Sequence, residues 1–268
     1  MSARILVDRC MTKPEVHTFA GGELAVFTAP RPGENTGNQD GAALVELGPG
    51  RGVLAVADGL GGQPSGDKAA RIGLESLVDS VLETEARGGS LRHAILDGVE
   101  RASQRVQGLG VGAATTLVVV EIDGGRLRPY HVGDSMILVV GQRGRRKLQT
   151  VSHSPVGYAV EAGVIDESEA LHHDELHLIS NMVGAADMRI EVGSTRPLAP
   201  RDTVLLASDG LLDNVHLEEI VGFVRRGPLD AAAERMVATA HARMAGEIEG
   251  PSKPDDTTFI AFRPRARR

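Results

Sequence analysis

The sequence predicts an α+β fold, in which layers of sheet and helix pack as a sandwich. Blocks of short apolar strands alternate with blocks of amphipathic helices along the 268 residues. The pattern lacks the strict β-α-β alternation that a doubly wound parallel sheet requires. It also lacks internal repeats and low-complexity linkers, so we expect one domain at 22–262, preceded by an N-terminal extension at 1–21 and followed by a basic tail at 263–268.

The elements of the first half follow from their periodicity and their turns. The Gly48-Pro49-Gly50 sequence between two apolar runs predicts an antiparallel hairpin. Two longer segments place apolar residues at helical spacing, with Ser65 and Ser90 as candidate N-caps. In order, we predict strands at 23–29, 42–47 and 52–57, helices at 66–84 and 90–107, and strands at 115–122, 127–132 and 136–140.

The second half of the chain is less regular. Residues 154–193 are polar, rich in histidine and acidic residues, and helical only in short pieces, which is typical of an inserted flap. Beyond this flap, the apolar pattern predicts strands at 203–207 and 257–262 and helices at 217–224 and 229–246.

Composition excludes several classes of protein. Acidic residues outnumber basic ones by 36 to 29 and aromatic residues are 3% of the chain, which argues against nucleic acid as a partner. No apolar run approaches the ~20 residues that span a bilayer, and the N-terminus lacks an apolar signal core, so no membrane partner is expected. The single cysteine, Cys10, excludes an internal disulfide. We therefore expect a cytoplasmic protein.

Five aspartates stand at the edges of apolar strands or in tight turns: Asp40, Asp58, Asp134, Asp209 and Asp255. A buried carboxylate is costly unless a charge compensates it, and several that converge would repel one another. Divalent cations that prefer oxygen ligands, such as Mg²⁺ and Mn²⁺, would offset that repulsion. Each aspartate taken alone also fits a turn, because Asp-Gly is a common turn dipeptide, and the spacing does not show that the five converge.

The aspartates lie within short motifs that share one order along the chain. These motifs are Asn38-Gln39-Asp40, Ala57-Asp58-Gly59-Leu60-Gly61-Gly62, Gly112-Ala113-Ala114-Thr115-Thr116, Val132-Gly133-Asp134-Ser135, Ser208-Asp209-Gly210-Leu211-Leu212-Asp213 and Asp255-Asp256-Thr257-Thr258. In this order the chain resembles the metal-dependent protein phosphatases, the type 2C serine/threonine phosphatases, over nearly its whole length. The resemblance implies a four-layer α-β-β-α sandwich with two central antiparallel sheets, a flap insertion at about 154–193, and metals at one end between the sheets.

The resemblance also implies a role for each aspartate. Asp58 would bridge two metals, Mn²⁺ or Mg²⁺, and the backbone carbonyl of Gly59 would bind the second of them. Asp209 and Asp255 would hold the first metal, and Asp40 would act through a metal-bound water. The reaction so implied is hydrolysis of phosphoserine or phosphothreonine by a metal-activated water, with Asp58, Asp209 and Asp255 as the catalytic residues.

Further expectations follow from the same resemblance. Asp134, together with Asp209, would bind a third, weaker metal. Asp256, where the family usually has asparagine, adds a carboxylate near the metals. The implied partners are a phosphorylated protein substrate and a cognate serine/threonine kinase encoded elsewhere, and the chain is expected to be a monomer.

Several positions that handle the substrate depart from the family pattern. Asn35 stands where an arginine usually grips the substrate phosphate, and Arg31 is the nearby cation. Gln63 replaces a histidine that is usual in bacterial members. In the flap, His173 is either a further substrate-binding candidate or a plain surface histidine.

These departures leave two other functions open. One is a pseudophosphatase, a module that binds a phosphoprotein or a kinase without turning it over, and Asn35 and Gln63 motivate it. The other is a metal-dependent hydrolase of small phosphate esters. The complete set of aspartates favours an active protein phosphatase over both.

Overall fold

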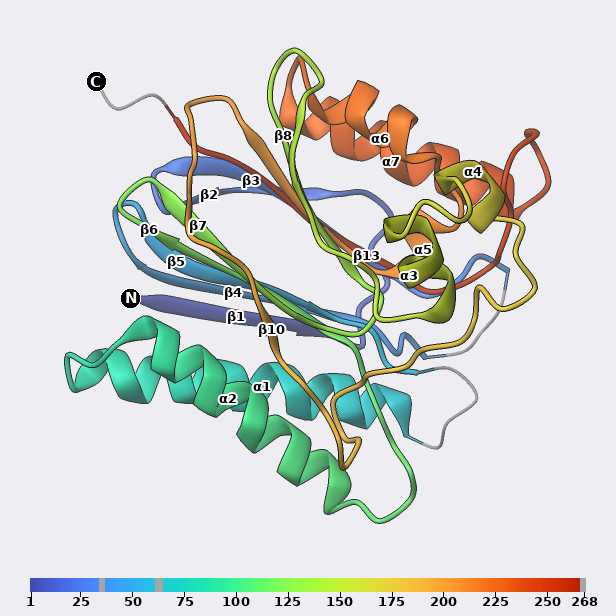
Figure 1. Cartoon of the computed structure of the whole chain (residues 1–268). Coiled ribbons are helices and arrows are strands. Elements are labelled where there is room, and N and C mark those ends of the chain that lie inside the picture. Colours follow the sequence, from blue (N-terminus) through green and yellow to red (C-terminus); the bar gives the residue numbers. More distant parts are fainter. Residues whose placement is uncertain (34–36, 61–64, 266–268) are drawn as a thin grey trace.

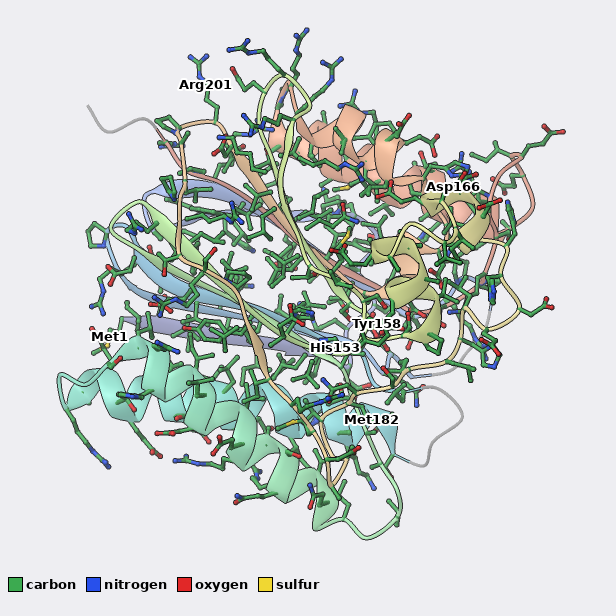
Figure 2. All side chains as sticks on the ribbon, in the orientation of Figure 1. Met1, His153, Tyr158, Asp166, Met182 and Arg201 are labelled. Carbon is green, nitrogen blue, oxygen red and sulfur yellow. The ribbon has the colours of Figure 1, made fainter. Side chains whose placement is uncertain are left out.

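Two antiparallel sheets pack face to face, and a layer of helices covers the outer face of each sheet (Figure 1). The computed structural model describes residues 1–33, 37–60 and 65–265. Side chains fill the space between the two sheets (Figure 2). The predicted α+β fold class, with its four-layer α-β-β-α sandwich, is thereby confirmed.

The first sheet has seven strands, in the order β1-β4-β5-β6-β7-β10, and β11 also pairs with β7. The predicted hairpin joins β4 to β5, where Gly48 pairs with Arg51 across the turn. The strands of this sheet are β1 (Ser2–Val7), β4 (Gly41–Gly48), β5 (Arg51–Ala57), β6 (Leu117–Asp123), β7 (Arg126–Val132), β10 (Glu191–Val192) and β11 (Arg196–Pro197).

The second sheet has six strands, in the order β2-β3-β13-β12-β8-β9. The two C-terminal strands of the sequence, β12 and β13, lie at its centre and pair with each other. The strands of this sheet are β2 (Glu15–Phe19), β3 (Gly22–Ala29), β8 (Met136–Val140), β9 (Arg146–Gln149), β12 (Thr203–Ala207) and β13 (Thr257–Arg263).

The helices form the two outer layers, the flap and one short turn near the site. Two long helices cover the first sheet (Figure 1): α1 (Gly66–Ala86) and α2 (Leu91–Gln107). The second sheet is covered by α6 (Leu217–Val224) and α7 (Leu229–Met244). The flap contributes α3 (Pro155–Glu161) and α4 (Glu167–Ala170), and the short α5 (Asp209–Leu212) follows β12. Within the described residues, no helix is both long and apolar enough to cross a membrane.

Two apolar cores form because successive side chains of a strand point to opposite faces of its sheet. In β4, Leu44 belongs to the core between the sheets, whereas Ala43 and Val45 pack into the core under α1 and α2. Likewise in β5, Leu54 faces the second sheet and Val53 faces the helices. Because both faces of these strands are buried, they are continuous apolar runs, and this is why the sequence identifies them well.

The N-terminal 21 residues are built into both sheets. β1 pairs with β4 at the edge of the first sheet, and β2 pairs with β3 at the edge of the second. Phe19 of β2 is buried, and its ring meets that of Phe262 edge-on at a centroid distance of 5.9 Å. Edge strands bury only part of their side chains, so the sequence of this segment did not carry the apolar run that marks the central strands.

Two further differences concern the ends of elements. β13 extends to Arg263, whose guanidinium donates to the carbonyls of Val224 and Gly227 at 2.8 and 2.6 Å. Arg263 is therefore part of the sandwich and not of the basic tail. Ser65 occupies the N-cap position of α1, but its φ is 64° and its side chain makes no capping hydrogen bond.

We expect Phe19→Ala to lower the free energy of unfolding by about 3–5 kcal/mol, the usual cost of deleting a buried phenylalanine side chain. Urea denaturation followed by circular dichroism measures the change. The matched control is Val16→Ala in the same strand, at a residue that is 43% exposed, which should cost less than about 1 kcal/mol. Equally small effects for the two variants would show that β2 is not part of the stable core.

Candidate active site

The five aspartates selected from the sequence lie at the ends of central strands from both sheets. In the first sheet, Asp58 directly follows β5 and Asp40 directly precedes β4. In the second sheet, Asp209 begins α5 just after β12, and Asp255 lies just before β13. Asp134 occupies the turn between β7 and β8, where the chain crosses from one sheet to the other.

Four of these carboxylates have a pKa that burial and the charges of neighbouring aspartates raise. Burial is the main cause that holds the pKa of Asp58 well above its usual range, and the charges of the other four aspartates add to it. Burial and the charge of Asp209 raise the pKa of Asp134 to about 7 and that of Asp255 to about 6. Burial also raises the pKa of Asp40, although a hydrogen bond to its side chain opposes this. The five residues therefore form one site, which the spacing in the sequence did not show.

Two buried threonines fix the position of Asp58. The Thr115 hydroxyl and the Thr116 N–H both donate to the Asp58 carbonyl, at 2.7 and 2.8 Å. The Asp58 N–H donates in turn to Oγ1 of Thr116 at 3.2 Å. The Thr116 hydroxyl also lies 2.7 Å from Oγ of Ser135, next to Asp134. These two threonines, to which their motif in the sequence gave no function, connect the segments that carry Asp58 and Asp134.

Asp40 is held by side chains of its own loop and of the second sheet. The Ser208 hydroxyl, just after β12, donates to Oδ2 of Asp40 at 2.7 Å. The Asp40 N–H donates to Oδ1 of Asn38 at 2.9 Å, and the Asn38 amide donates to Oγ1 of Thr28 in β3 at 2.8 Å. Because Ser208 directly precedes Asp209, this network also fixes the distance between two of the carboxylates.

Two glycines allow the loops of the site to approach closely. A Cβ at Gly59 would overlap the carbonyl of Gly66 and lie 2.7 Å from that of Gln39. A Cβ at Gly210 would overlap the carbonyl of Asp256. The family resemblance implies that the Gly59 carbonyl binds a metal. The close packing against Gly66 is an independent reason why this position needs a glycine. Gly210 brings the start of α5 against the loop that carries the last aspartates.

Asp256 binds the loop that precedes β4. Its Oδ1 accepts from the Arg31 N–H at 2.9 Å, and its Oδ2 accepts from the Gln39 N–H at 2.6 Å. Burial raises the pKa of Asp256, and the two amides and the charge of Arg31 lower it. Arg31 thus lies beside the aspartate cluster. Asn35, in the same loop, and Gln63 are outside the described residues.

A lysine that the sequence analysis did not select lies within the cluster. Nζ of Lys253 is 2.7 Å from Oδ2 of Asp209 and 2.7 Å from Oδ2 of Asp213. Burial lowers the pKa of Lys253, but the charges of these two aspartates raise it by more. Burial and the charge of Asp209 raise the pKa of Asp213 to about 7. The available clue was that Lys253 is a basic residue only two positions before Asp255.

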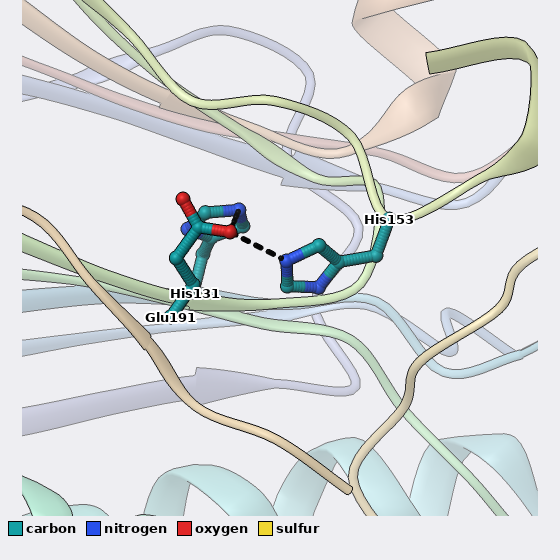
Figure 3. A group of neighbouring side chains, drawn as sticks. All are labelled: His131, His153 and Glu191. Atoms are coloured by element: carbon teal, nitrogen blue, oxygen red, sulfur yellow. Dashed lines mark hydrogen bonds and ion pairs between the residues drawn. The ribbon is translucent and has the colours of Figure 1, made fainter. Parts of the chain in front are cut away.

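A pair of stacked histidines supports the turn that carries Asp134 (Figure 3). The rings of His131 and His153 are 4.4 Å apart, beside the carboxylate of Glu191. His153 accepts from the Gly133 N–H through Nδ1 at 3.1 Å, so its Nε2 carries a proton and donates to Glu191 at 3.2 Å. Nε2 of His131 lies 2.9 Å from the carbonyl of Val151, which requires a proton there too. Both nitrogens near Glu191 are therefore protonated, which suits a hydrogen-bonded support better than a metal site.

His173 is exposed on the flap, after α4. Its Nδ1 accepts from the Glu175 N–H at 3.1 Å, a contact within its own turn. A role in substrate binding stays a prediction for this residue.

The aspartate cluster fits divalent cations that prefer oxygen ligands. Oδ1 of Asp134 is buried and has no hydrogen-bond partner in the described part of the chain, and such an atom is costly unless a cation or donor reaches it. Burial and the neighbouring negative charges raise the pKa values of these aspartates, and bound cations would compensate both effects. Three ligand atoms within 4.8 Å of one another occur, among the described residues, only at His131, His153 and Glu191.

The pKa of Asp134 makes the stability of the metal-free protein depend on pH. Its folded value of about 7 exceeds the ordinary 3.8, so its contribution is fully present below about pH 4 and is lost as the pH rises to about 7. Asp134→Asn should therefore leave stability unchanged at about pH 4 and raise it by up to about 4 kcal/mol at about pH 8. Urea denaturation in a chelating buffer measures this difference. The control is Asp97→Asn on the exposed side of α2, and a pH-independent difference for Asp134→Asn would contradict the electrostatic origin.

Comparison with known proteins places this site in a family. The family model of protein phosphatase 2C matches residues 32–246. The protein phosphatase PhpP of Streptococcus pneumoniae is 30% identical over 219 residues, which cover 78% of this chain and 87% of PhpP. The structure of the S. agalactiae serine/threonine phosphatase is similar with a TM-score of 0.76 and 26% identity, over 91% of this chain and all of that one.

A third comparison concerns the fold alone. The catalytic domain of the serine/threonine phosphatase PstP, solved in complex with two manganese ions, has a TM-score of 0.68 and 23% identity over 91% of this chain and 98% of that domain. The match of the family model to most of the chain, together with PhpP, shows that the chain belongs to the protein phosphatase 2C family.

Proposed function

We propose that this chain is a metal-dependent serine/threonine protein phosphatase that uses Mn²⁺ or Mg²⁺ at the aspartate cluster. The observation that carries the proposal is the convergence of five aspartates at one end of the two sheets, where burial and the charges of neighbouring aspartates raise the pKa of Asp40, Asp58, Asp134 and Asp255. The similarity to PhpP and to the S. agalactiae phosphatase supports the same activity. The substrates would be phosphoproteins, and the kinase that phosphorylates them would be a separate protein. The phosphatase itself would be cytoplasmic.

The residues of the chain have separable tasks in this proposal. When bound, a pair of divalent ions would lower the pKa of a water and neutralise charge on the phosphoryl group. Asp58 and the Gly59 carbonyl would hold the pair from the first sheet, and Asp209 and Asp255 from the second. Because these ligands come from central strands of both sheets, the packing between the sheets would fix the distance between the two sets of ligands.

Arg31 is the residue that we assign to the substrate phosphate. A guanidinium offers paired N–H donors that match phosphate oxygens. The Arg31 backbone is fixed to Asp256, which also lies beside the metal ligand Asp255. The loop is thus anchored at a point from which the long Arg31 side chain would meet a phosphate at the cluster.

A pseudophosphatase is not favoured by these observations. All five aspartates are present, and the threonine, serine and glycine residues that position them are present too. A binding module without turnover would not need to maintain carboxylates at the cost of mutual repulsion.

Asp58→Asn should abolish metal-dependent turnover. With Mn²⁺, we expect the wild type to release phosphate from a phosphothreonine peptide and the variant to lose at least about a hundredfold in kcat/KM, the usual scale for losing one contact to the developing charge. Chelation of the wild type should have the same effect. Phosphate release by malachite green is the measurement, with Asp97→Asn as the control. Turnover that survives either chelation or Asp58→Asn would sink the proposal.

Arg31→Ala should weaken substrate binding more than chemistry. If Arg31 grips the phosphate equally in the bound and reacting states, KM for a phosphopeptide rises by about tenfold and kcat changes little. Arg31→Lys keeps the charge but loses the paired geometry, so it should restore only part of the affinity. Parallel assays with p-nitrophenyl phosphate tell whether a small ester depends on Arg31 equally. Unchanged KM values in Arg31→Ala would assign phosphate binding to another residue.

A further inference from the structure

The backbone of Lys253 is fixed against α5. Its N–H donates to Oδ1 of Asn214 at 2.8 Å, and its carbonyl accepts from the Asn214 amide at 2.8 Å. The same amide also donates to the carbonyl of Gly210 in α5, at 2.9 Å. Asn214 is fully buried. The backbone of Lys253 is therefore held in a defined position, from which its side chain extends to the aspartate cluster.

The ammonium group of Lys253 joins two carboxylates from opposite ends of α5. Asp209 begins this helix and Asp213 directly follows it, and Nζ lies 2.7 Å from one oxygen of each. Asp134 lies near this ion pair, since the charges of Asp209, Asp213 and Lys253 all act on it. Lys253 does not bind it, because the buried Oδ1 of Asp134 has no hydrogen-bond partner among the described residues.

The ion pair between Lys147 and Asp202 is a useful comparison, because this lysine binds outside the aspartate cluster. Nζ of Lys147 lies 2.7 Å from both oxygens of Asp202, so it binds a single carboxylate. That carboxylate also accepts from the Ala199 N–H in its own turn. Lys253 differs because it spans two carboxylates that would otherwise repel each other, one of them an expected metal ligand.

We propose that Lys253 is a built-in cation of the site, which takes the place of a third divalent ion between Asp209 and Asp213. This inference rests on the metal centre of the proposed function. A divalent ion bound there would face the ammonium charge at close range, and like charges at such distances repel strongly inside a protein. The chain would therefore bind a pair of divalent ions and exclude the third that the family resemblance implies.

Counting bound Mn²⁺ tests this inference without any measurement of activity. Equilibrium dialysis against Mn²⁺, with the bound metal determined by mass spectrometry, gives the number of ions per chain. We expect Lys253→Met to bind one more Mn²⁺ than the wild type, since removal of the ammonium frees two carboxylates. Lys147→Met is the matched control, because it also loses an ion pair of a partly buried lysine, and it should bind the same number as the wild type.

Thermal unfolding gives a second readout. Lys253→Met should have a lower Tm than the wild type without metal, because Asp209 and Asp213 lose their counter-charge, and a larger rise in Tm when Mn²⁺ is added. Lys253→Arg keeps the charge and should match the wild type in Mn²⁺ count.

The possible outcomes are distinct. Equal Mn²⁺ counts for the wild type and Lys253→Met would overturn the inference and leave the phosphatase proposal intact. So would a third Mn²⁺ on the wild type itself, a measurement that needs no variant to fold. A wild type that binds no Mn²⁺ would overturn the metal centre, and this inference with it.

Discussion

Carboxylates buried together at one end of a sandwich repel one another, and much of the surrounding structure serves to hold them in place against that repulsion. Burial and this repulsion disfavour the ionised forms of Asp58 and Asp134, and the pKa of each is raised as a result. The restraints are short hydrogen bonds to the backbone and to single oxygens, such as those of Thr115 to the Asp58 carbonyl and Ser208 to Asp40. These bonds position the aspartates without neutralising them, so the charge stays available for cations.

The two apolar cores make such restraint possible. Strands whose side chains are buried on both faces cannot shift without opening a core, because protein interiors are close-packed. β5 and β12 are of this kind, with residues of each fully buried, and each ends just before a metal-ligand candidate. The distance between Asp58 and Asp209 is therefore set by the packing between sheets, which explains how a site drawn from distant parts of the sequence remains rigid.

The sequence predicted the central strands, the long helices and the identity of the aspartates, because each aspartate ends or begins a run of buried apolar residues. It did not predict their convergence, which depends on pairing between strands far apart in the chain. It also left β1 and β2 unassigned, since edge strands such as the one with Phe19 bury few side chains. Lys253 was missed because its contact with Asp209 depends on Asn214, a buried side chain whose partners no local pattern reveals.

Asp256 in the last motif and Lys253, two residues before that motif begins, add charges of opposite sign. Asp256 adds a carboxylate, but its two oxygens accept from the backbone N–H groups of Arg31 and Gln39. Its negative charge therefore stabilises the loop that carries Arg31. An asparagine at this position has a single acceptor oxygen, so it could not accept from both backbone N–H groups through separate oxygens as Asp256 does. Lys253 adds a positive charge between Asp209 and Asp213. Asp256 thus orders the loop that carries Arg31, whereas the ammonium group of Lys253 lies among the carboxylates of the cluster, so the two residues place opposite charges on different partners.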